Sequence, residues 1–187
     1  MEVKLKDITQ IQFGYYAQPS KNGNIKYLQA KHFKDLGQLV SDNDTFLEDD
    51  EKTNANLLED GDILFAAKGF RFFAALYKAE FGKAVASSIF FIIKPNTQKI
   101  IPGYLVSVLN LPKNLLHFQQ SGAGSSIPSM RKNELLDFTF NLIPIAQQHK
   151  IVSLQELYIK DLELTESLIK KKQLLFQTAL NKLIIEN

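Results

Sequence analysis

The chain has 187 residues, of which 45% are hydrophobic and 14 are phenylalanine, and its formal net charge is +2. This length fits one domain, or one domain with an appendage, and the composition can form a hydrophobic core. The sequence contains no cysteine, which excludes disulfides, a thiol nucleophile and a zinc–thiolate site. The first residues lack the apolar segment of a signal peptide, and no apolar run approaches the ~18 residues of a membrane span. We therefore expect a soluble, cytoplasmic protein with no membrane association.

The charge is distributed unevenly along the chain. Acidic residues outnumber lysine and arginine in residues 1–60, whereas basic residues predominate in residues 61–140. Most of the early acids lie in the polar stretch 41–56, which predicts a solvated loop. Asp42 and Asp44 begin like a calcium-binding loop, but no glycine follows at the turn and no glutamate closes the frame. We expect no metal site there.

Three strands are predicted in the middle of the chain. Residues 61–67 and 72–77 have strand composition and flank a turn that contains Gly69. Residues 85–93 form a nearly continuous run of β-branched and aromatic side chains. Such a run is typical of a strand that is buried on both faces. We therefore expect it to be a single strand in the centre of a sheet.

Helical and extended segments follow these strands. Residues 103–120 predict a helix that Pro112 interrupts and that the Gly/Ser loop 121–126 ends. Asn133 has the side chain of a helix N-cap and predicts a short helix. Residues 138–143 then return as a strand. This order of elements indicates an α+β domain with a mixed sheet.

The stretch 145–187 contains neither glycine nor proline and predicts one long C-terminal α-helix. Such a helix would be roughly 60 Å long, which exceeds the diameter of a domain formed by the other residues, about 25 to 30 Å. We expect it to extend beyond the domain and to pair with a partner helix; folding back onto its own domain is the alternative. Apolar side chains recur at intervals of three and four residues, and those proposed for the pairing seam are Ile151, Leu154, Tyr158, Leu162, Ile169, Phe176 and Leu180.

A strict heptad would place Lys172 on this seam. The drift of the apolar stripe follows the 3.6-residue period of a straight helix. The pattern therefore favours a straight or gently twisted helix pair over a long left-handed coiled coil.

The sequence offers little that is typical of an active site. The three histidines lie in unrelated contexts, and no pair has the spacing of a metal site. The Gly/Ser loop 121–126 lacks the lysine of a P-loop. A nuclease arrangement can be imagined from Asp62, Glu80 and Lys83, but residues this common meet by chance in most chains. We expect no catalytic residue, no metal and no cofactor.

Basic residues of the middle segment suggest nucleic-acid binding instead. The sequence Lys68-Gly69-Phe70-Arg71 follows a predicted strand, so a turn there would present two cations and a ring. Cations neutralise phosphates, and polar side chains can read base edges in the major groove. Four further cations can extend the positive field, namely Lys78, Lys83, Arg131 and Lys132. An ordinary solvated basic face is the alternative.

The order of these segments carries a family resemblance. Residues 58–64 read Leu-Glu-Asp-Gly-Asp-Ile-Leu, a Lys-Gly turn follows, and residues 86–95 read Ala-Ser-Ser-Ile-Phe-Phe-Ile-Ile-Lys-Pro. With the helix and the Gly/Ser loop that come next, this order resembles the target recognition domain of type I restriction-modification specificity subunits. Residues 143–152 read Ile-Pro-Ile-Ala-Gln-Gln-His-Lys-Ile-Val. They resemble the Pro-apolar-x-Glu-Gln-x-x-Ile-Val start of that family's spacer helix, with Gln147 in place of the glutamate.

The resemblance implies a non-catalytic DNA-recognition role. Specificity subunits of that family have two recognition domains and two spacer helices, and they bring modification (methyltransferase) and restriction subunits to a bipartite site in double-stranded DNA. This chain resembles half of such a subunit, with residues 1–143 as the DNA-binding domain and residues 144–187 as the spacer and dimerisation helix. The other half is expected from a second copy, so the resemblance implies a homodimer with two-fold symmetry and a symmetric, gapped target.

The resemblance also implies which polar loops contact DNA. The residues concerned are Gln18, Lys21, Asn22, Lys68, Arg71, Ser125 and Ser126. Ordinary surface polarity is the alternative for each of them. The rings of Phe13, Tyr15 and Tyr16 can touch thymine methyl groups, or they can pack in the core. Two alternative functions stay open for the chain. It can be a degenerate specificity-like protein that binds no DNA, or it can be a nuclease.

Overall fold

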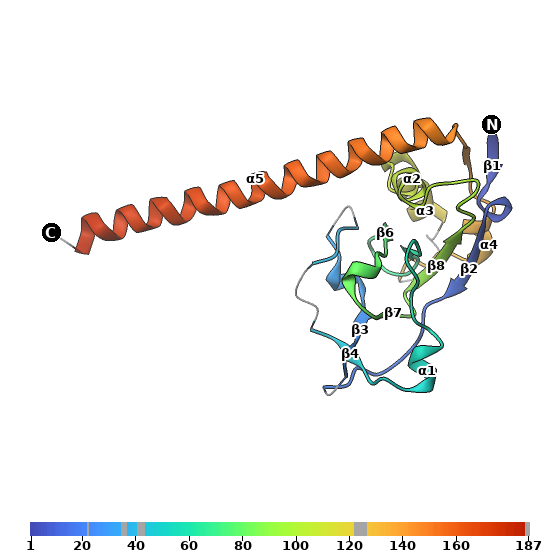
Figure 1. Cartoon of the computed structure of the whole chain (residues 1–187), viewed down its shortest axis with the longest axis horizontal. Helices are drawn as coiled ribbons and strands as arrows, with labels where there is room; N and C mark the ends of the chain where they lie inside the picture. The colour runs from blue at the N-terminus through green and yellow to red at the C-terminus, as the bar shows by residue number, and fades with distance from the viewer. Residues whose placement is uncertain (22, 35–36, 41–43, 122–126, 186–187) are drawn as a thin grey trace. The chain divides into compact units, whose positions relative to one another are not determined.

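The computed structural model describes residues 1–187 except 22, 35–36, 41–43, 122–126 and 186–187 (Figure 1). The chain separates into two compact units, Met1–His149 and Lys150–Asn187. The first unit contains three β-sheets and the shorter helices, and the second is the greater part of one helix. A functional boundary between residues 143 and 144 stays a prediction.

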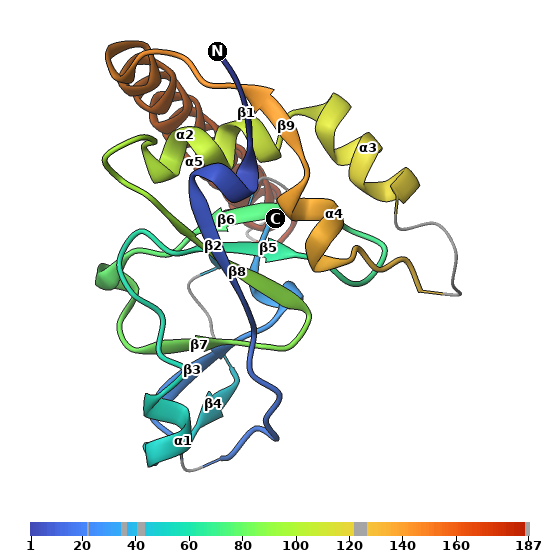
Figure 2. The same ribbon diagram turned by 90° about the vertical axis from the view of Figure 1, so that its right-hand side faces the viewer.

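A four-stranded antiparallel sheet forms the centre of the first unit (Figure 2). Its order is β2 (Thr9–Phe13), β8 (Phe90–Pro95), β5 (Ile63–Ala66) and β6 (Ala74–Leu76). All four side chains of β5 are buried. A strand that is buried on both faces has no polar face to present, which explains its uninterrupted apolar sequence. The predicted strands 61–67 and 72–77 are confirmed.

The two faces of this sheet have different coverings. Leu64 and Ala66 of β5 belong to a buried cluster that also holds Leu28 and Ala86 from the second sheet. Phe65, which alternates with them, packs edge-to-face on Phe118, with 5.2 Å between ring centroids. The core therefore lies in two layers, one on each side of β5.

The second sheet has three strands in the order β4 (Phe46–Leu47), β3 (Ile25–Leu28) and β7 (Ala84–Ala86). Strands β3 and β7 are parallel, whereas β3 and β4 are antiparallel. The sheet is therefore mixed, and the α+β fold class with a mixed sheet is confirmed. The expected loop 41–56 is wrong in part, because its described residues include β4 and the short helix α1 (Glu51–Asn54).

The single strand predicted over residues 85–93 is also wrong. The chain leaves the second sheet at the end of β7 and enters the first at Phe90. The backbone N–H of Ser87 donates to the Leu28 carbonyl at 2.9 Å, and the N–H of Phe90 donates to the Ser87 carbonyl at 3.0 Å. The turn interrupts an apolar run that is buried on both sides of it, so the run itself gives no sign of the break.

The helices of the first unit follow the predicted breaks more closely. Helix α2 (Pro102–Leu109) lies against β6, and α3 (Pro112–Ser121) begins at the proline that was expected to interrupt the helix. Helix α4 (Lys132–Leu136) is capped by Arg131, whose backbone N–H donates to Glu134 Oε2 at 2.8 Å. The prediction that Asn133 is the cap is wrong, because Glu134 supplies the capping side chain.

A two-stranded sheet joins the two ends of the first unit. Strands β1 (Glu2–Lys4) and β9 (Thr139–Asn141) are antiparallel, so the strand predicted over residues 138–143 is confirmed in shorter form. The remaining elements are single 3₁₀ turns, η1 (Leu5–Asp7), η2 (Ala30–His32) and η3 (Ala79–Phe81).

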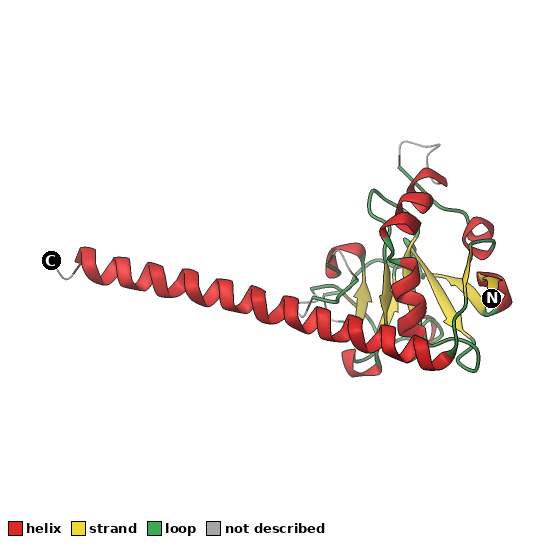
Figure 3. Ribbon diagram, turned by 90° about the horizontal axis from the view of Figure 1, so that it is seen from above, coloured by secondary structure: helices red, strands yellow, loops and turns green. Residues whose placement is uncertain are grey.

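Helix α5 (Ile145–Ile185) is one unbroken helix of 41 residues, as Figure 3 shows. The prediction of a long C-terminal helix is confirmed. A lone helix has no second surface against which to bury apolar side chains, and most of the large ones in the second unit are exposed. In the part of the chain that the structure describes, no helix is both long enough and apolar enough to cross a bilayer.

Candidate nucleic-acid interface

Strands β2 and β5 end at the same edge of the central sheet. Both are antiparallel to β8, which lies between them, so they run in the same direction. Phe13 and Phe65 pair with the same residue, Phe91, from opposite sides. The segments that follow β2 and β5 therefore leave the sheet side by side. Side chains at this edge can form one surface although they are far apart in the sequence.

The turn after β5 is held to a distant segment by backbone hydrogen bonds. The N–H of Gly69 donates to the Pro128 carbonyl at 2.9 Å, and the N–H of Met130 donates to the Ala67 carbonyl at 2.8 Å. Gly69 has φ of +112°, a conformation that other residues rarely adopt. The turn therefore has a defined shape. It presents Lys68, which is exposed, and Phe70, whose relative exposure is 80%.

The distant segment adds two cations beside this turn. Arg131 is exposed, and Lys132 places Nζ at 5.5 Å from the centre of the Phe13 ring. Phe13 itself is 63% exposed and packs edge-to-face on Phe91, with 5.4 Å between centroids. We call this surface the basic-aromatic edge, and it consists of Phe13, Lys68, Phe70, Arg131 and Lys132. Among the described residues, none of its three cations has an acidic side chain within 4.0 Å.

Arg71 has a different environment from its neighbours in the same turn. Its Nη2 donates to two backbone carbonyls, of Ala30 at 2.9 Å and of Phe33 at 2.7 Å. Its guanidinium carbon also lies 4.8 Å from the centre of the Phe73 ring. These contacts attach the segment around Ala30 to the core. The structure thus gives Arg71 a structural role, and its predicted DNA contact stays a prediction.

The predicted contacts near the start of the chain lie beside the second sheet. Gln18 and Lys21 are exposed, and the backbone N–H of Ser20 between them donates to the Phe46 carbonyl of β4 at 2.8 Å. The Ser20 hydroxyl donates to Glu48 Oε1 at 3.0 Å. Glu48 begins an acidic run, Glu48-Asp49-Asp50-Glu51. The segment with Gln18 and Lys21 therefore lies next to negative charge.

Of the seven residues predicted to contact DNA, the structure places Lys68 in the basic-aromatic edge and the other described ones elsewhere. Lys68 lies in the basic-aromatic edge, Arg71 is engaged with backbone carbonyls, and Gln18 and Lys21 belong to another surface. Asn22, Ser125 and Ser126 lie outside the described residues. Lys78 and Lys83 do not join the edge either, because their ammonium groups face Glu80 at 3.7 Å and Asp49 at 3.6 Å.

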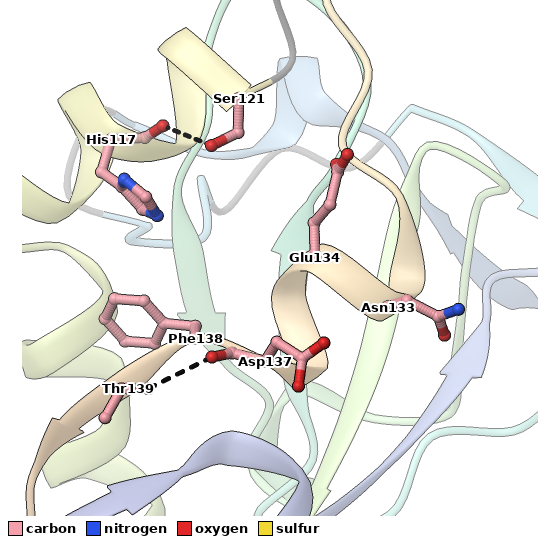
Figure 4. Close-up of a pocket in the computed structure, with 7 residues that line it drawn as sticks. All are labelled: His117, Ser121, Asn133, Glu134, Asp137, Phe138 and Thr139. Atoms are coloured by element: carbon pink, nitrogen blue, oxygen red, sulfur yellow. Dashed lines mark hydrogen bonds between the residues drawn. The ribbon is translucent and has the colours of Figure 1, made fainter.

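An open polar pocket of about 680 Å³ lies beside α4 (Figure 4). Its lining includes His117, Ser121 and Asp137. The Ser121 hydroxyl donates to the His117 carbonyl at 3.0 Å, so it is bonded to backbone instead of to the imidazole. Hydrogen bonds from Lys6 at 2.9 Å and Lys4 at 3.3 Å hold the pKa of Asp137 below its ordinary value. Among the described residues that line the pocket, no nucleophile is hydrogen-bonded to a base.

Each member of the imagined nuclease arrangement has a partner elsewhere. Both carboxylate oxygens of Asp62 lie 3.1 Å from Lys94 Nζ, and Asp62 Oδ2 accepts the Glu59 N–H at 2.9 Å. Burial nevertheless raises the pKa of this carboxyl, against the opposing effects of the Glu59 N–H and Lys94. Glu80 lies 3.7 Å from the ammonium group of Lys78, and the ammonium group of Lys83 lies 3.6 Å from Asp49. Within the described residues, no group of three or more acidic, histidine or cysteine side chains is placed to hold a metal ion.

Gln148 fixes the first turn of α5, residues 145–149, within the first unit. Its side chain is fully buried, Oε1 accepts the Ile101 N–H at 2.8 Å, and Nε2 donates to the Ile143 carbonyl at 2.8 Å. Gln147, the residue singled out in the sequence, is exposed, and the buried contacts of Gln148 were not predicted. All seven residues of the predicted seam lie within α5, and every one except Leu162 is exposed.

Comparisons with known proteins give one consistent result. The profile of the family described as Type I restriction modification DNA specificity domain matches residues 1–173. The S subunit of a type I restriction-modification system from M. genitalium has a TM-score of 0.67 and 13% identity, with 100% of this chain and 46% of that chain covered. The HsdS subunit from Thermoanaerobacter tengcongensis has a TM-score of 0.65 and 21% identity, with 97% and 48% covered.

A third structure concerns complex assembly and conformational transition of the type I R-M system. It has a TM-score of 0.64 and 20% identity, with 98% of this chain and 49% of that chain covered. The chain thus spans about half the length of each of these three solved chains. At such identities the similarity shows a shared fold. No curated protein matches the chain.

Proposed function

This chain belongs to the family of type I restriction-modification DNA specificity domains, and from that membership we propose that it is a DNA sequence-recognition subunit. Each chain would bind one half-site of a bipartite target in double-stranded DNA and would not itself be catalytic. The observation that carries the proposal is the extent of the family match, which includes both the recognition domain and most of α5. The basic-aromatic edge supports it, because cations with no acidic partner among the described residues favour phosphate binding.

The partners follow from the same role. A subunit that only reads sequence needs others for chemistry, so we propose that it docks a modification (methyltransferase) subunit and a restriction subunit in the cytoplasm. Where such subunits are present, deletion of the gene should remove one methylated motif from the genome. That motif should be gapped, because each recognition domain reads its own half-site.

The helix supports a homodimer. The exposed apolar seam of α5 needs a second apolar surface, and the same helix of a second copy supplies one of identical chemistry. A two-fold axis would then direct two recognition domains at inverted half-sites. The spacing would be set by the helix, on the order of one DNA turn or more, ~35 Å upward.

Methylome sequencing with and without the gene tests the DNA-recognition proposal. We expect a gapped motif that disappears on deletion, and the purified chain should bind duplexes carrying that motif with an affinity that falls steeply with salt. An unchanged methylome, together with equally weak binding of every duplex, would favour a degenerate protein. Metal-dependent cleavage of DNA by the purified chain alone would favour a nuclease.

Light scattering at micromolar concentration tests the dimer separately. Ile169→Glu places a charge on the seam and should produce monomers, whereas Lys170→Glu, on a different side of the helix, should leave the dimer intact. A monomeric wild-type chain would refute the homodimer without affecting the recognition of a half-site.

A further inference from the structure

Two surfaces of the first unit compete for the role of DNA contact, and their electrostatics differ. The basic-aromatic edge carries three cations without an acidic partner among the described residues. The segment with Gln18 and Lys21 is bonded to β4 and to Glu48, which begins a run of four acidic residues. Phosphates are attracted to the first surface and repelled by the second.

We infer that the basic-aromatic edge is the surface of this chain that contacts duplex DNA, and that the segment with Gln18 and Lys21 does not; this inference rests on the proposed DNA-recognition function. Lys68 and Arg131 contact phosphates from two segments that backbone hydrogen bonds hold together. Such contacts fix orientation on the duplex and carry no sequence information.

Phe70 reads the bases in this arrangement. Its ring is 80% exposed at the tip of a turn and has no ring partner among the described residues, so most of its apolar surface is left free by that part of the domain. The turn is shaped by Gly69 and by its bonds to residues 128–130, so the ring projects from a defined backbone. An apolar side chain flanked by a cation can contact a thymine methyl group in the major groove while the cation binds the neighbouring phosphate.

The aromatic ring of Phe13 has a supporting role. Lys132 lies over this ring at 5.5 Å, and the ring rests on Phe91 of the central sheet. A lysine held over a ring loses part of its freedom before DNA arrives, which reduces the entropy lost on binding. Lys132 is therefore a positioned cation, in contrast to the freely moving lysines of an ordinary solvated face.

Salt-dependent binding by the full-length chain tests the phosphate contacts. The probe is a duplex enriched by the wild-type chain from a library with a randomised centre. Lys68→Ala and Arg131→Ala should each reduce the slope of log affinity against log salt by about 0.9. Lys21→Ala and Lys113→Ala, which remove exposed lysines from other surfaces of the same unit, should leave the slope unchanged.

Phe70 needs a different measurement, namely the ratio of affinities for the enriched duplex and a scrambled one. Phe70→Ala should reduce this ratio about tenfold while the salt slope stays the same, because the lost contact is apolar and base-specific. Phe70→Leu keeps an apolar contact and should retain most of the ratio. The exposed position makes misfolding of either variant improbable, and their unfolding midpoints provide the check.

The outcomes separate the inference from the function on which it rests. The inference is wrong if only Lys21→Ala lowers the salt slope, or if all four lysine and arginine variants lower it equally. DNA recognition still stands in either case, provided that the wild-type chain discriminates between duplexes. If Phe70→Ala leaves discrimination unchanged, the base-reading role is wrong. A wild-type chain that shows no preference among duplexes and no methylated motif in the genome overturns the proposed function, and the inference with it.

Discussion

Replacement of Gln148 by alanine should destabilise the first unit more than alanine at any exposed position of α5. The side chain satisfies two backbone groups from different segments, the Ile101 N–H and the Ile143 carbonyl, each at 2.8 Å, and it is fully buried. Alanine leaves both groups without a partner. Each unsatisfied buried group costs about 1–3 kcal/mol, so the free energy of unfolding should fall by about 2–6 kcal/mol. The better helix propensity of alanine offsets only about 0.5 kcal/mol of this loss.

Tyrosine signals and hydrogen exchange measure the effect where it arises. All tyrosines except Tyr158 lie in the first unit, so near-ultraviolet circular dichroism during urea unfolding reports on that unit. Exchange of the Ile101 amide should accelerate selectively in Gln148→Ala. Gln147→Ala is the matched control, because the neighbouring side chain is exposed and its loss should change stability by less than about 0.5 kcal/mol.

Gln148→Glu tests the same reasoning through pH. A carboxylate keeps the acceptor for the Ile101 N–H but repels the Ile143 carbonyl, whereas the protonated acid can donate to that carbonyl. Burial should raise the pKa of the new carboxyl above its unfolded value. The stability of this variant should therefore be greatest in acid and should fall as pH rises from the unfolded pKa through the folded one. Identical midpoints for Gln148→Ala and Gln147→Ala, with an unchanged Ile101 amide, would refute the argument.

Three further predictions follow from the contacts of single side chains. Arg71→Ala should lower the free energy of unfolding by about 2 kcal/mol, and Arg71→Lys should not restore it, because one planar guanidinium contacts two carbonyls and a ring. Unchanged stability with a loss of DNA binding would instead favour a direct contact between Arg71 and DNA. Ser87→Ala should raise the unfolding free energy by about 1 kcal/mol, since the buried Ser87 hydroxyl has no partner among the described residues; a loss of stability would contradict this. Asp137→Asn should lower the melting temperature at neutral pH, because hydrogen bonds from Lys6 and Lys4 lower the pKa of Asp137 and so favour its ionised form in the folded state. That difference should vanish as pH falls through the folded pKa of Asp137, and a difference that persists in strong acid would exclude the ion pair as its cause.

The long helix and the β5 strand were predictable because each depends on local composition. The absence of glycine and proline over residues 145–187 and the apolar run before Gly69 need no knowledge of distant segments. The break at Pro112 was predictable for the same reason, since proline acts on its own backbone. The family resemblance, now confirmed, rested on the order of such local segments and on the residues that begin α5.

The incorrect predictions, and the contacts that the sequence did not reveal, depend on tertiary structure. Whether the run 85–93 is one strand or two depends on which sheet accepts each half, and both halves are equally apolar. Arg71 looked like a surface cation because its carbonyl partners lie about forty residues earlier in the sequence. Gln148 was missed since no pattern within a helix distinguishes a glutamine that bonds across the domain from an exposed one.

The arrangement of the first unit separates the residues that keep it folded from those proposed to read DNA. Arg71, Asp62 and Gln148 bond to backbone or charge inside the unit, and their replacement leaves polar groups unsatisfied. Lys68 and Phe70 lie on the turn that follows β5, and Arg131 lies on the segment that is hydrogen-bonded to this turn. The side chains of Lys68, Phe70 and Arg131 contribute little to the buried core. Substitutions at the basic-aromatic edge can therefore change which duplex is bound at little cost in stability. A recognition domain built in this way can acquire a new specificity while its core and the start of α5 stay the same.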